Sequence, residues 1–305
     1  MRIACTTWPG GGNVAVFRAL ADRLRSRGHD VDVTIGALDA MPVYSGADAY
    51  LVDSMLGVPG LEAGVACGQP VAAVVHTLGS FVPLLEGTWA PPPFLDLLAA
   101  LDRQLVFTAR ELDAPGYAPA NLRYVGPVLE AEGPDAGWRP PDRSLVVVSL
   151  GTTDMEEGPV LQRVLDALAS LPVDVVATAG EHLDTSALRV PANARVTGFI
   201  RHAALLPHAD VFVGHGGLGG IMAALAFGVP IVTLPLDRDQ PFNAARVAAV
   251  GAGVTVDKHA APADIAAAVE AVRTGTRERE GAIRMANAIA GYGNAALDEV
   301  EALGR

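Results

Sequence analysis

Residues 208–246, HADVFVGHGGLGGIMAALAFGVPIVTLPLDRDQPFNAAR, constrain the fold more than any other stretch of the chain. The apolar run at 211–213 predicts a buried strand, and 231–234 predicts a second one. Between them, 221–227 is apolar on every side, which predicts a buried helix that Gly228 ends. The predicted elements follow the order expected of an α/β fold: a strand, a glycine-rich turn, a helix, a second strand, a polar loop and a second helix.

The turn after the first of these strands contains Gly214, His215, Gly216 and Gly217. Glycines let a ligand approach the backbone closely. The free N–H groups and the dipole at a helix start favour an anionic group there, and His215 adds one more donor for a phosphate oxygen. The sequence therefore predicts an anion site at this turn. The alternative is that the glycines only permit tight packing of strand and helix.

This stretch resembles the donor-sugar motif of GT-B glycosyltransferases of family-1 type, the macrolide and natural-product type. Their pattern is His-Gly-Gly-x-Gly-Thr-x-x-Glu-Ala-Leu, then Gly-Val-Pro, then Asp-Gln-x-x-Asn-Ala-x-Arg-Val. The chain has HGGLGGIMAAL at 215–225, GVP at 228–230 and DQPFNAARV at 239–247. Two positions depart from the pattern. Gly220 replaces a hydroxyl that touches phosphate in the family, and Ala223 replaces a carboxylate that holds the nucleotide ribose.

The resemblance implies an α/β fold of GT-B type, in which two Rossmann-like, doubly wound domains face a cleft and the donor binds in the carboxyl-terminal one. It also implies that Asp239 and Gln240 bind sugar hydroxyls, and that the turn at 149–153 is the phosphate-side loop. As an alternative, Asp239 caps a helix at 243–250. The expected donor-binding residues are Ser149, Gly151, Thr152, His215, Gly216, Gly217, Gly219, Gly220, Asp239, Gln240 and Asn243.

A length of 305 residues suits two domains of ordinary size. The first would be an acceptor-side Rossmann-like domain at 1–130, and a linker rich in Pro and Gly would follow at 131–143. The second, at 144–305, would be the nucleotide-sugar-binding domain. Family members usually carry extra acceptor-binding segments where this chain has only 36–46 and 79–93, so the first domain is expected to be shortened.

Charge and cysteine content narrow the class of protein. A nucleic-acid binder needs a basic surface, and with a net charge of −12 and a single lysine none is visible in the sequence. Cys5 and Cys67 are too few for a disulfide scaffold and are expected to be small core residues. The uncharged stretch 216–236 is long enough to flag as a membrane span, but its glycines and its Gly-Val-Pro favour strand, helix and strand. We therefore expect a cytoplasmic protein with no membrane span.

The general base is the least defined part of the expected site. Asn13 stands where many family members have their catalytic histidine, and an amide takes no proton at neutral pH. Asn13 is alternatively a helix cap. Asp53 and His76 both follow predicted parallel strands, where open α/β sheets place ligands. We expect His76 to be the base, oriented by Asp53 if the two strand ends are neighbours. The alternatives are a structural histidine and a cap on the helix after Asp53.

The resulting hypothesis is a metal-independent, inverting hexosyltransferase of natural-product or antibiotic biosynthesis, with no cofactor. It would move a hexose from a UDP or dTDP sugar to a hydroxyl of a small secondary metabolite. Asn13, Gly220, Ala223 and the short first domain favour an alternative, a catalytically silent GT-B relative that acts as a binding or auxiliary subunit. A third hypothesis is a GT-B enzyme with non-glycosyl chemistry. The oligomeric state stays open between a homodimer and an assembly with a partner protein.

Overall fold

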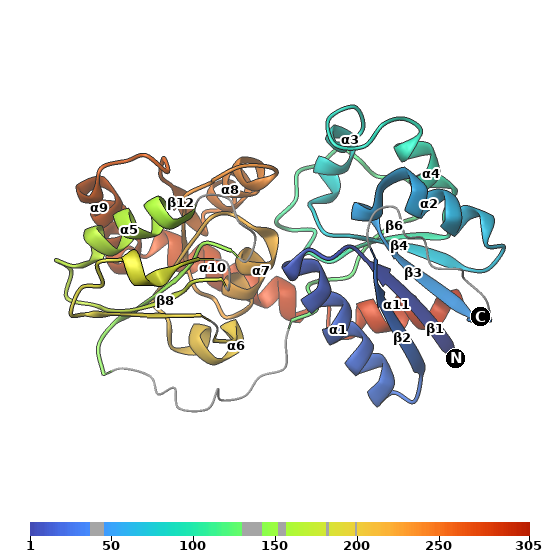
Figure 1. Cartoon of the computed structure of the whole chain (residues 1–305), viewed down its shortest axis with the longest axis horizontal. Coiled ribbons are helices and arrows are strands. Elements are labelled where there is room, and N and C mark those ends of the chain that lie inside the picture. The colour runs from blue at the N-terminus through green and yellow to red at the C-terminus, as the bar shows by residue number, and fades with distance from the viewer. Residues whose placement is uncertain (37–45, 130–141, 152–156, 181–182, 199) are drawn as a thin grey trace. The chain divides into compact units, whose positions relative to one another are not determined.

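The computed structural model describes residues 1–36, 46–129, 142–151, 157–180, 183–198 and 200–305 (Figure 1). The chain divides into two compact units. Unit 1 comprises Met1–Leu129 together with Tyr292–Arg305, and unit 2 comprises Glu130–Gly291. Each unit is built on its own parallel sheet, which confirms the predicted pair of Rossmann-like α/β folds.

Unit 1 has the strand order β2-β1-β3-β4-β5-β6. The strands are β1 (Arg2–Thr7), β2 (Asp30–Ile35), β3 (Ala49–Asp53), β4 (Val71–Val75), β5 (Arg103–Val106) and β6 (Leu122–Tyr124). The α-helices are α1 (Gly11–Ser26), α2 (Gly57–Ala66), α3 (Val82–Leu85), α4 (Phe94–Ala100) and α11 (Ala295–Leu303). Short 3₁₀-helices lie at Ser54–Leu56 (η1) and Gly79–Phe81 (η2).

The middle of this sheet determines where polar side chains gather. β3 and β4 are buried at every position, as expected for parallel strands covered on both faces. β3 pairs with β1 on one side and with β4 on the other, in parallel register. The carboxyl ends of β1, β3 and β4 are therefore neighbours, and the residues that follow these strands meet at one edge of the sheet.

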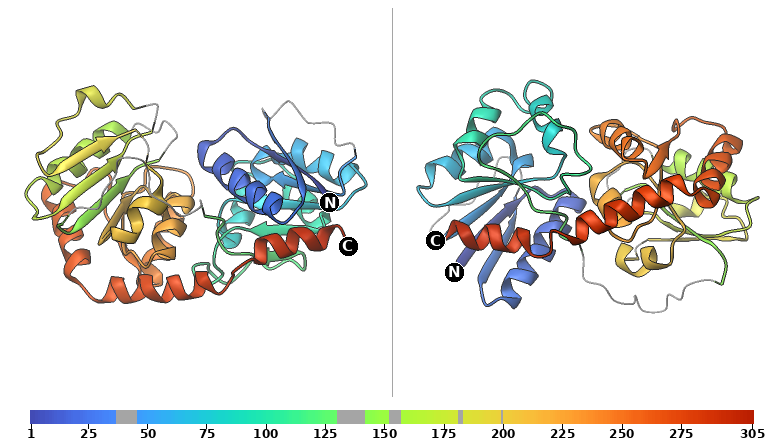
Figure 2. Two further views of the ribbon diagram at one scale, coloured as in Figure 1. Left: turned by 90° about the horizontal axis from the view of Figure 1, so that it is seen from below. Right: turned by 180° about the vertical axis from the view of Figure 1, so that it is seen from behind.

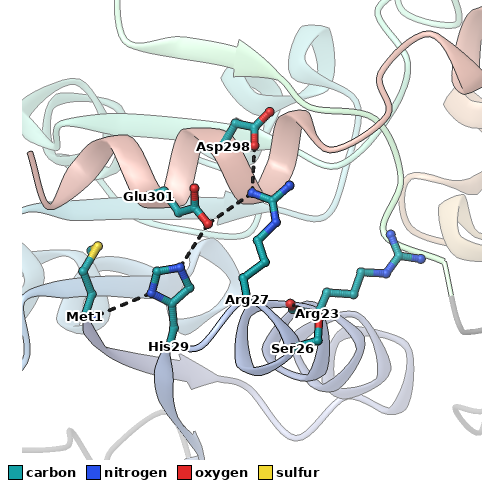
Figure 3. Close-up of polar contacts among 7 residues, drawn as sticks. All are labelled: Met1, Arg23, Ser26, Arg27, His29, Asp298 and Glu301. Carbon is teal, nitrogen blue, oxygen red and sulfur yellow. Dashed lines mark hydrogen bonds and ion pairs between the residues drawn. The ribbon is translucent and has the colours of Figure 1, made fainter.

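The carboxyl-terminal helix α11 packs in unit 1, whereas the sequence places it in the second domain. It shares a core with β1 and α1 through apolar residues on one face, namely Ala296, Leu297, Val300 and Leu303. Figure 3 shows the polar side of the contact. Arg27 pairs with Asp298 at 2.8 Å and with Glu301 at 3.1 Å, and His29 lies 3.0 Å from Glu301. Figure 2 shows α11 alongside the sheet of unit 1 in both views.

Unit 2 has the strand order β12-β11-β10-β7-β8-β9. The strands are β7 (Leu145–Ser149), β8 (Asp174–Thr178), β9 (Ala194–Thr197), β10 (Val211–Gly214), β11 (Ile231–Thr233) and β12 (Gly253–Thr255). The α-helices are α5 (Glu157–Leu168), α6 (His202–Leu205), α7 (Leu218–Ala226), α8 (Gln240–Ala249), α9 (Pro262–Thr274) and α10 (Arg277–Ala290). Two 3₁₀-helices lie at Thr185–Ala187 (η3) and Leu206–His208 (η4).

The helices of unit 2 form a core with the alternating apolar residues of its strands. α5 and α9 pack against each other and share one cluster with β7, β8 and β10. α7 packs against α10. Because β10 is buried throughout, the polar residues of this part of the chain follow its carboxyl end. Within the described ranges, no helix is both long and apolar enough to span a bilayer.

Candidate active site

The turn between β10 and α7 depends on glycine at two positions. Gly216 has φ +89°, and a Cβ atom there would lie 2.9 Å from the backbone oxygen of Gln240. A Cβ atom on Gly217 would lie 2.3 Å from Nε2 of His215. A side chain at either position would therefore collide with the start of α8 or with the imidazole. The glycines allow His215 and α8 to approach the start of α7 closely.

The start of α7 offers backbone donors for an anion. The helix begins at Leu218, earlier than the 221 expected, and Gly217 at its N-cap provides no side chain to cap it. The first amides of a helix have no intrahelical acceptor, and the helix dipole is positive there. A Cβ atom on Gly219 would meet open space. This geometry suits a phosphate group.

His215 lies against the loop that follows β7. Its buried Nδ1 atom has no hydrogen-bond partner among the described residues, although the nearby backbone of Ser149, the last residue of β7, raises the pKa of the imidazole. Gly151 has φ +110°, and a Cβ atom there would lie 3.2 Å from Cε1 of His215. Burial lowers the pKa of His215 more than the Ser149 backbone and the negative charge of Asp239 raise it, so the ring is neutral near pH 7. Thr152, also expected here, lies outside the described residues.

The start of α8 is tied to the same turn through Asn243. Its Nδ2 atom donates to the Gly216 carbonyl at 3.1 Å and to Oδ2 of Asp239 at 3.1 Å. Asn243 is fully buried, and its Oδ1 atom has no hydrogen-bond partner among the described residues. The two halves of the sequence motif, which are separated by β11, thus meet at one place.

Asp239 and Gln240 have different environments. Asp239 is the N-cap residue of α8, but its side chain makes no capping bond, so the carboxylate is held by Asn243 instead. Gln240 is buried, and its Oε1 atom accepts from the backbone N–H groups of Leu236 at 2.8 Å and Asp237 at 3.1 Å. Asp239 remains partly exposed. Its carboxylate is the better placed of the two to meet a ligand, whereas the Gln240 oxygen shapes the preceding turn.

Gly220 and Ala223, the two residues that depart from the family pattern, both lie on α7. A Cβ atom on Gly220 would lie 3.2 Å from Cζ of Phe212, so the phenyl ring of β10 closes the space beside this position. Ala223 lies on α7 and is buried, with 7% of its surface exposed. Neither residue offers a side-chain donor or acceptor to a ligand.

A buried carboxylate gathers donors at the carboxyl edge of the unit 1 sheet. Asp53 ends β3 and is fully buried. Its Oδ2 atom accepts from Oγ1 of Thr7 at 2.7 Å and from Nδ2 of Asn13 at 3.0 Å, and the Trp8 N–H lies 3.4 Å away. Burial alone would raise the pKa of Asp53. The facing His76 and the bonds from Thr7 and the Met55 N–H outweigh burial and lower this pKa, which keeps the carboxylate ionised.

His76 faces the same carboxylate oxygen. It follows β4, and its Nε2 atom lies 3.4 Å from Oδ2 of Asp53, although no hydrogen bond from any described residue reaches this nitrogen. Phe17 of α1 and Phe107 after β5 flank the ring at centroid distances of 5.7 and 6.5 Å. The side chain is 10% exposed. The two strand ends are therefore neighbours, which is the condition for Asp53 to orient His76.

Asn13 is not the helix cap that the sequence suggests. α1 begins at Gly11, because the Gly10 carbonyl already accepts from the N–H groups of Asn13 and Val14 at 3.0 and 3.1 Å. The Asn13 side chain instead donates to Asp53. Asp53 does cap the helix that follows it, because its Oδ1 atom accepts from the Met55 N–H at 2.9 Å at the start of η1. Its other oxygen, Oδ2, is the one that faces His76.

Two polar contacts of these sites were missed from the sequence. Thr7 ends β1, so the rule that ligands gather at carboxyl ends of parallel strands would have found it. Lys258 donates from Nζ to the Leu236 carbonyl at 2.9 Å, next to the turn that precedes α8. The sequence carries no local signal for this contact, because the two residues lie on different loops.

Comparisons with known proteins point to one family. Residues 162–296 match the family model described as erythromycin biosynthesis protein CIII-like, C-terminal domain. The chain is 38% identical over 216 residues to 4'-demethylrebeccamycin synthase of Lentzea aerocolonigenes, a match that covers 68% of this chain and 51% of that protein. The chain thus spans about half the length of the curated relatives it matches.

Solved structures extend the likeness to the whole chain. The glycotransferase of kitacinnamycin superposes with a TM-score of 0.81 at 23% identity, over 99% of this chain and 98% of that one. The glycosyltransferase VinC, solved in complex with dTDP, gives a TM-score of 0.75 at 20% identity, over 100% and 99% of the two chains. At these identities the likeness establishes the fold, which is that of GT-B proteins.

Proposed function

The chain belongs to the family of proteins like erythromycin biosynthesis protein CIII, natural-product glycosyltransferases of the GT-B fold, and on this premise we propose that it is an inverting glycosyltransferase. Its donor is a nucleoside-diphosphate hexose, with UDP or dTDP as the nucleotide. Its acceptor is a hydroxyl group of a small secondary metabolite. VinC, which shares the fold, was solved with dTDP, and this supports the nucleotide class.

The observation that carries the proposal is the start of α7. His215, the backbone of Gly216 and Gly217, and the loop after β7 converge there, and Asn243 ties Asp239 to the same turn. Fixed hydrogen-bond donors that face a developing charge commonly lower the activation barrier more than any other feature of an active site. During transfer, the bond from the anomeric carbon to the diphosphate oxygen breaks, and the negative charge that grows on this oxygen meets the amides of α7 and the His215 N–H.

The acceptor hydroxyl must lose its proton as its oxygen bonds to the anomeric carbon. We assign this step to the His76 imidazole, with Asp53 as the carboxylate that orients the ring and stabilises its charged form. Asn13 is assigned a role through Asp53, to which it donates. On the donor side, Asp239 binds sugar hydroxyls and the Gln240 oxygen holds the turn beside it.

A silent relative is the second candidate, because three positions of the family pattern lack their functional groups. Asn13 cannot take a proton, Gly220 lacks a hydroxyl, and Ala223 lacks the carboxylate that would hold ribose. In this case the protein would bind a nucleotide or a partner without turnover. Incubation of the protein with a nucleotide sugar and hydroxylated acceptors distinguishes the two candidates. A glycosyltransferase releases the nucleoside diphosphate, and a silent relative does not.

Nucleotide binding to unit 2 is the test of the proposed function. UDP or dTDP at a hundredfold excess over its Kd should stabilise the protein by about 2.7 kcal/mol, seen as a rise in Tm. His215→Ala should abolish the rise, because the variant loses the ring that faces the start of α7. His259→Ala, at an exposed histidine of the same unit, is the matched control. A wild-type Tm that does not change at millimolar UDP and dTDP would refute the proposal.

A further inference from the structure

A side chain outside the family motif holds the turn that carries Asp239. Lys258, the only lysine of the chain, donates from Nζ to the Leu236 carbonyl at 2.9 Å. It lies between β12 and α9, and its own carbonyl accepts from Nε and Nη2 of Arg163 at 3.0 and 2.7 Å. Arg163 belongs to α5. The ammonium group therefore reaches the turn from a loop that is itself fixed to a helix.

The turn needs such support. Arg238 has φ +60°, in the left-handed region that residues with a Cβ atom rarely adopt. Such conformations persist where the surrounding contacts over-determine them. Gln240 accepts from the Leu236 N–H, and Lys258 donates to the Leu236 carbonyl, so both backbone polar groups of one residue are held by side chains. Asp239 follows directly after this strained segment.

We propose that Lys258 is a positioning residue for the sugar of the donor. It fixes the carbonyl of Leu236, and thereby the path of residues 236–239, so that the Asp239 carboxylate meets the hydroxyl groups of a nucleoside-diphosphate hexose. The inference rests on the proposed function. A charged donor makes a stronger bond than a neutral one, and this favours an ammonium group for holding a strained turn.

The two parts of the donor depend on different ends of this segment. The diphosphate faces His215 and the start of α7, which Asn243 ties to the near end of α8 through the Gly216 carbonyl. Lys258 acts at the other end of the segment, before Arg238. Loss of the ammonium group should therefore weaken binding of the sugar while leaving binding of the nucleotide almost unchanged.

Hydrogen exchange tests the hold on the turn without any ligand. In Lys258→Met, the Leu236 and Asp237 amides should exchange about tenfold faster, because loss of a charged hydrogen bond lets the turn open more often. Lys258→Arg keeps a charged donor and should exchange like the wild type. Arg284→Met removes a cation–carbonyl contact elsewhere in unit 2 and should leave these two amides unchanged. Unchanged exchange in Lys258→Met, or equally fast exchange in Lys258→Arg, would overturn the proposal.

Titration calorimetry tests the role in donor binding, with dTDP, dTDP-glucose, UDP and UDP-glucose as probes. The glucose contributes the ratio of the Kd of the free nucleotide to the Kd of the nucleotide sugar. In Lys258→Met this ratio should fall about tenfold, while the Kd of the free nucleotide stays within about twofold of the wild type. Equal weakening of nucleotide and nucleotide sugar would overturn the proposal, as would a wild type that gains nothing from glucose on either nucleotide. Failure of the wild type to bind any nucleotide would refute the proposed function instead, and hydrogen exchange would still decide whether Lys258 holds the turn.

Discussion

Acid should destabilise unit 2 through His202, a histidine near His215 of the proposed donor site. His202 begins α6, and its ring stands edge-on to Phe212 at a centroid distance of 5.6 Å. Burial, together with the nearby His215, lowers the pKa of His202 to about 4. The unfolded chain binds this proton near pH 6.5, so between about pH 6.5 and 4 the unfolded state carries more protons than the folded one. Stability must then fall as pH falls through this window.

The size of the effect follows from the two pKa values. Linkage between about 6.5 and about 4 gives a loss of about 2 kcal/mol for unit 2 between pH 7 and pH 5 from His202 alone. His202→Phe keeps an aromatic ring against Phe212 and removes the titration, so its loss over the same range should be smaller by that amount. Asp53 does not interfere, because its lowered pKa places its contribution below about pH 4.

Native-state hydrogen exchange of the β10 amides measures the free energy of unfolding of unit 2 at each pH, after correction for the intrinsic exchange rate. His259→Gln changes an exposed histidine of this unit and should retain the wild-type difference between pH 7 and pH 5. If His202→Phe loses as much stability as the wild type, to within about 0.5 kcal/mol, the burial argument for His202 is wrong.

Two further predictions concern the candidate sites. Ala223→Glu should tighten UDP by about tenfold or more in calorimetry, since a carboxylate hydrogen bond to ribose is worth roughly 1.5–3 kcal/mol; a wild type that already prefers UDP strongly over dUDP would show that another residue makes this contact. His76→Ala should slow turnover by ~10²–10⁴-fold with nucleotide binding intact, and Asp53→Asn should cost less. Turnover in His76→Ala within about threefold of the wild type would rule out His76 as the base.

The local structure of the motif at 215–247 was predictable because its signals lie close together in the sequence. A side chain at Gly217 would collide with His215, and one at Gly216 would collide with the start of α8. The apolar runs on either side form the buried strand β10 and the buried helix α7. The family resemblance also implied that both halves of the motif bind one donor, and Asn243 joins the two halves in the structure. The motif did not predict that the Gln240 oxygen binds backbone N–H groups while the Asp239 carboxylate stays with Asn243. This difference depends on which backbone groups of the turn lack a hydrogen-bond partner.

Long-range packing explains the differences between the sequence prediction and the structure. The apolar face of α11 packs against β1 and α1, and its acidic side chains pair with Arg27, His29 and Arg103 of unit 1. These contacts join residues far apart in the sequence and assign α11 to unit 1. The sequence suggests Asn13 as a cap because a run of glycines gives no signal for where α1 begins. Its bond to Asp53 joins residues 40 positions apart, beyond the reach of any local pattern.

The surroundings of Asp53 favour the enzyme over the silent relative. A cap on η1 needs one acceptor for the Met55 N–H, and a neutral serine or asparagine would serve there. The chain instead buries an ionised carboxylate completely, which is unfavourable unless the charge is paired and hydrogen-bonded. Thr7 and Asn13 supply the hydrogen bonds at Oδ2, and His76 faces the same oxygen. A carboxylate held ionised beside an imidazole stabilises the imidazolium that proton abstraction creates, and a cap on η1 alone does not require this charge.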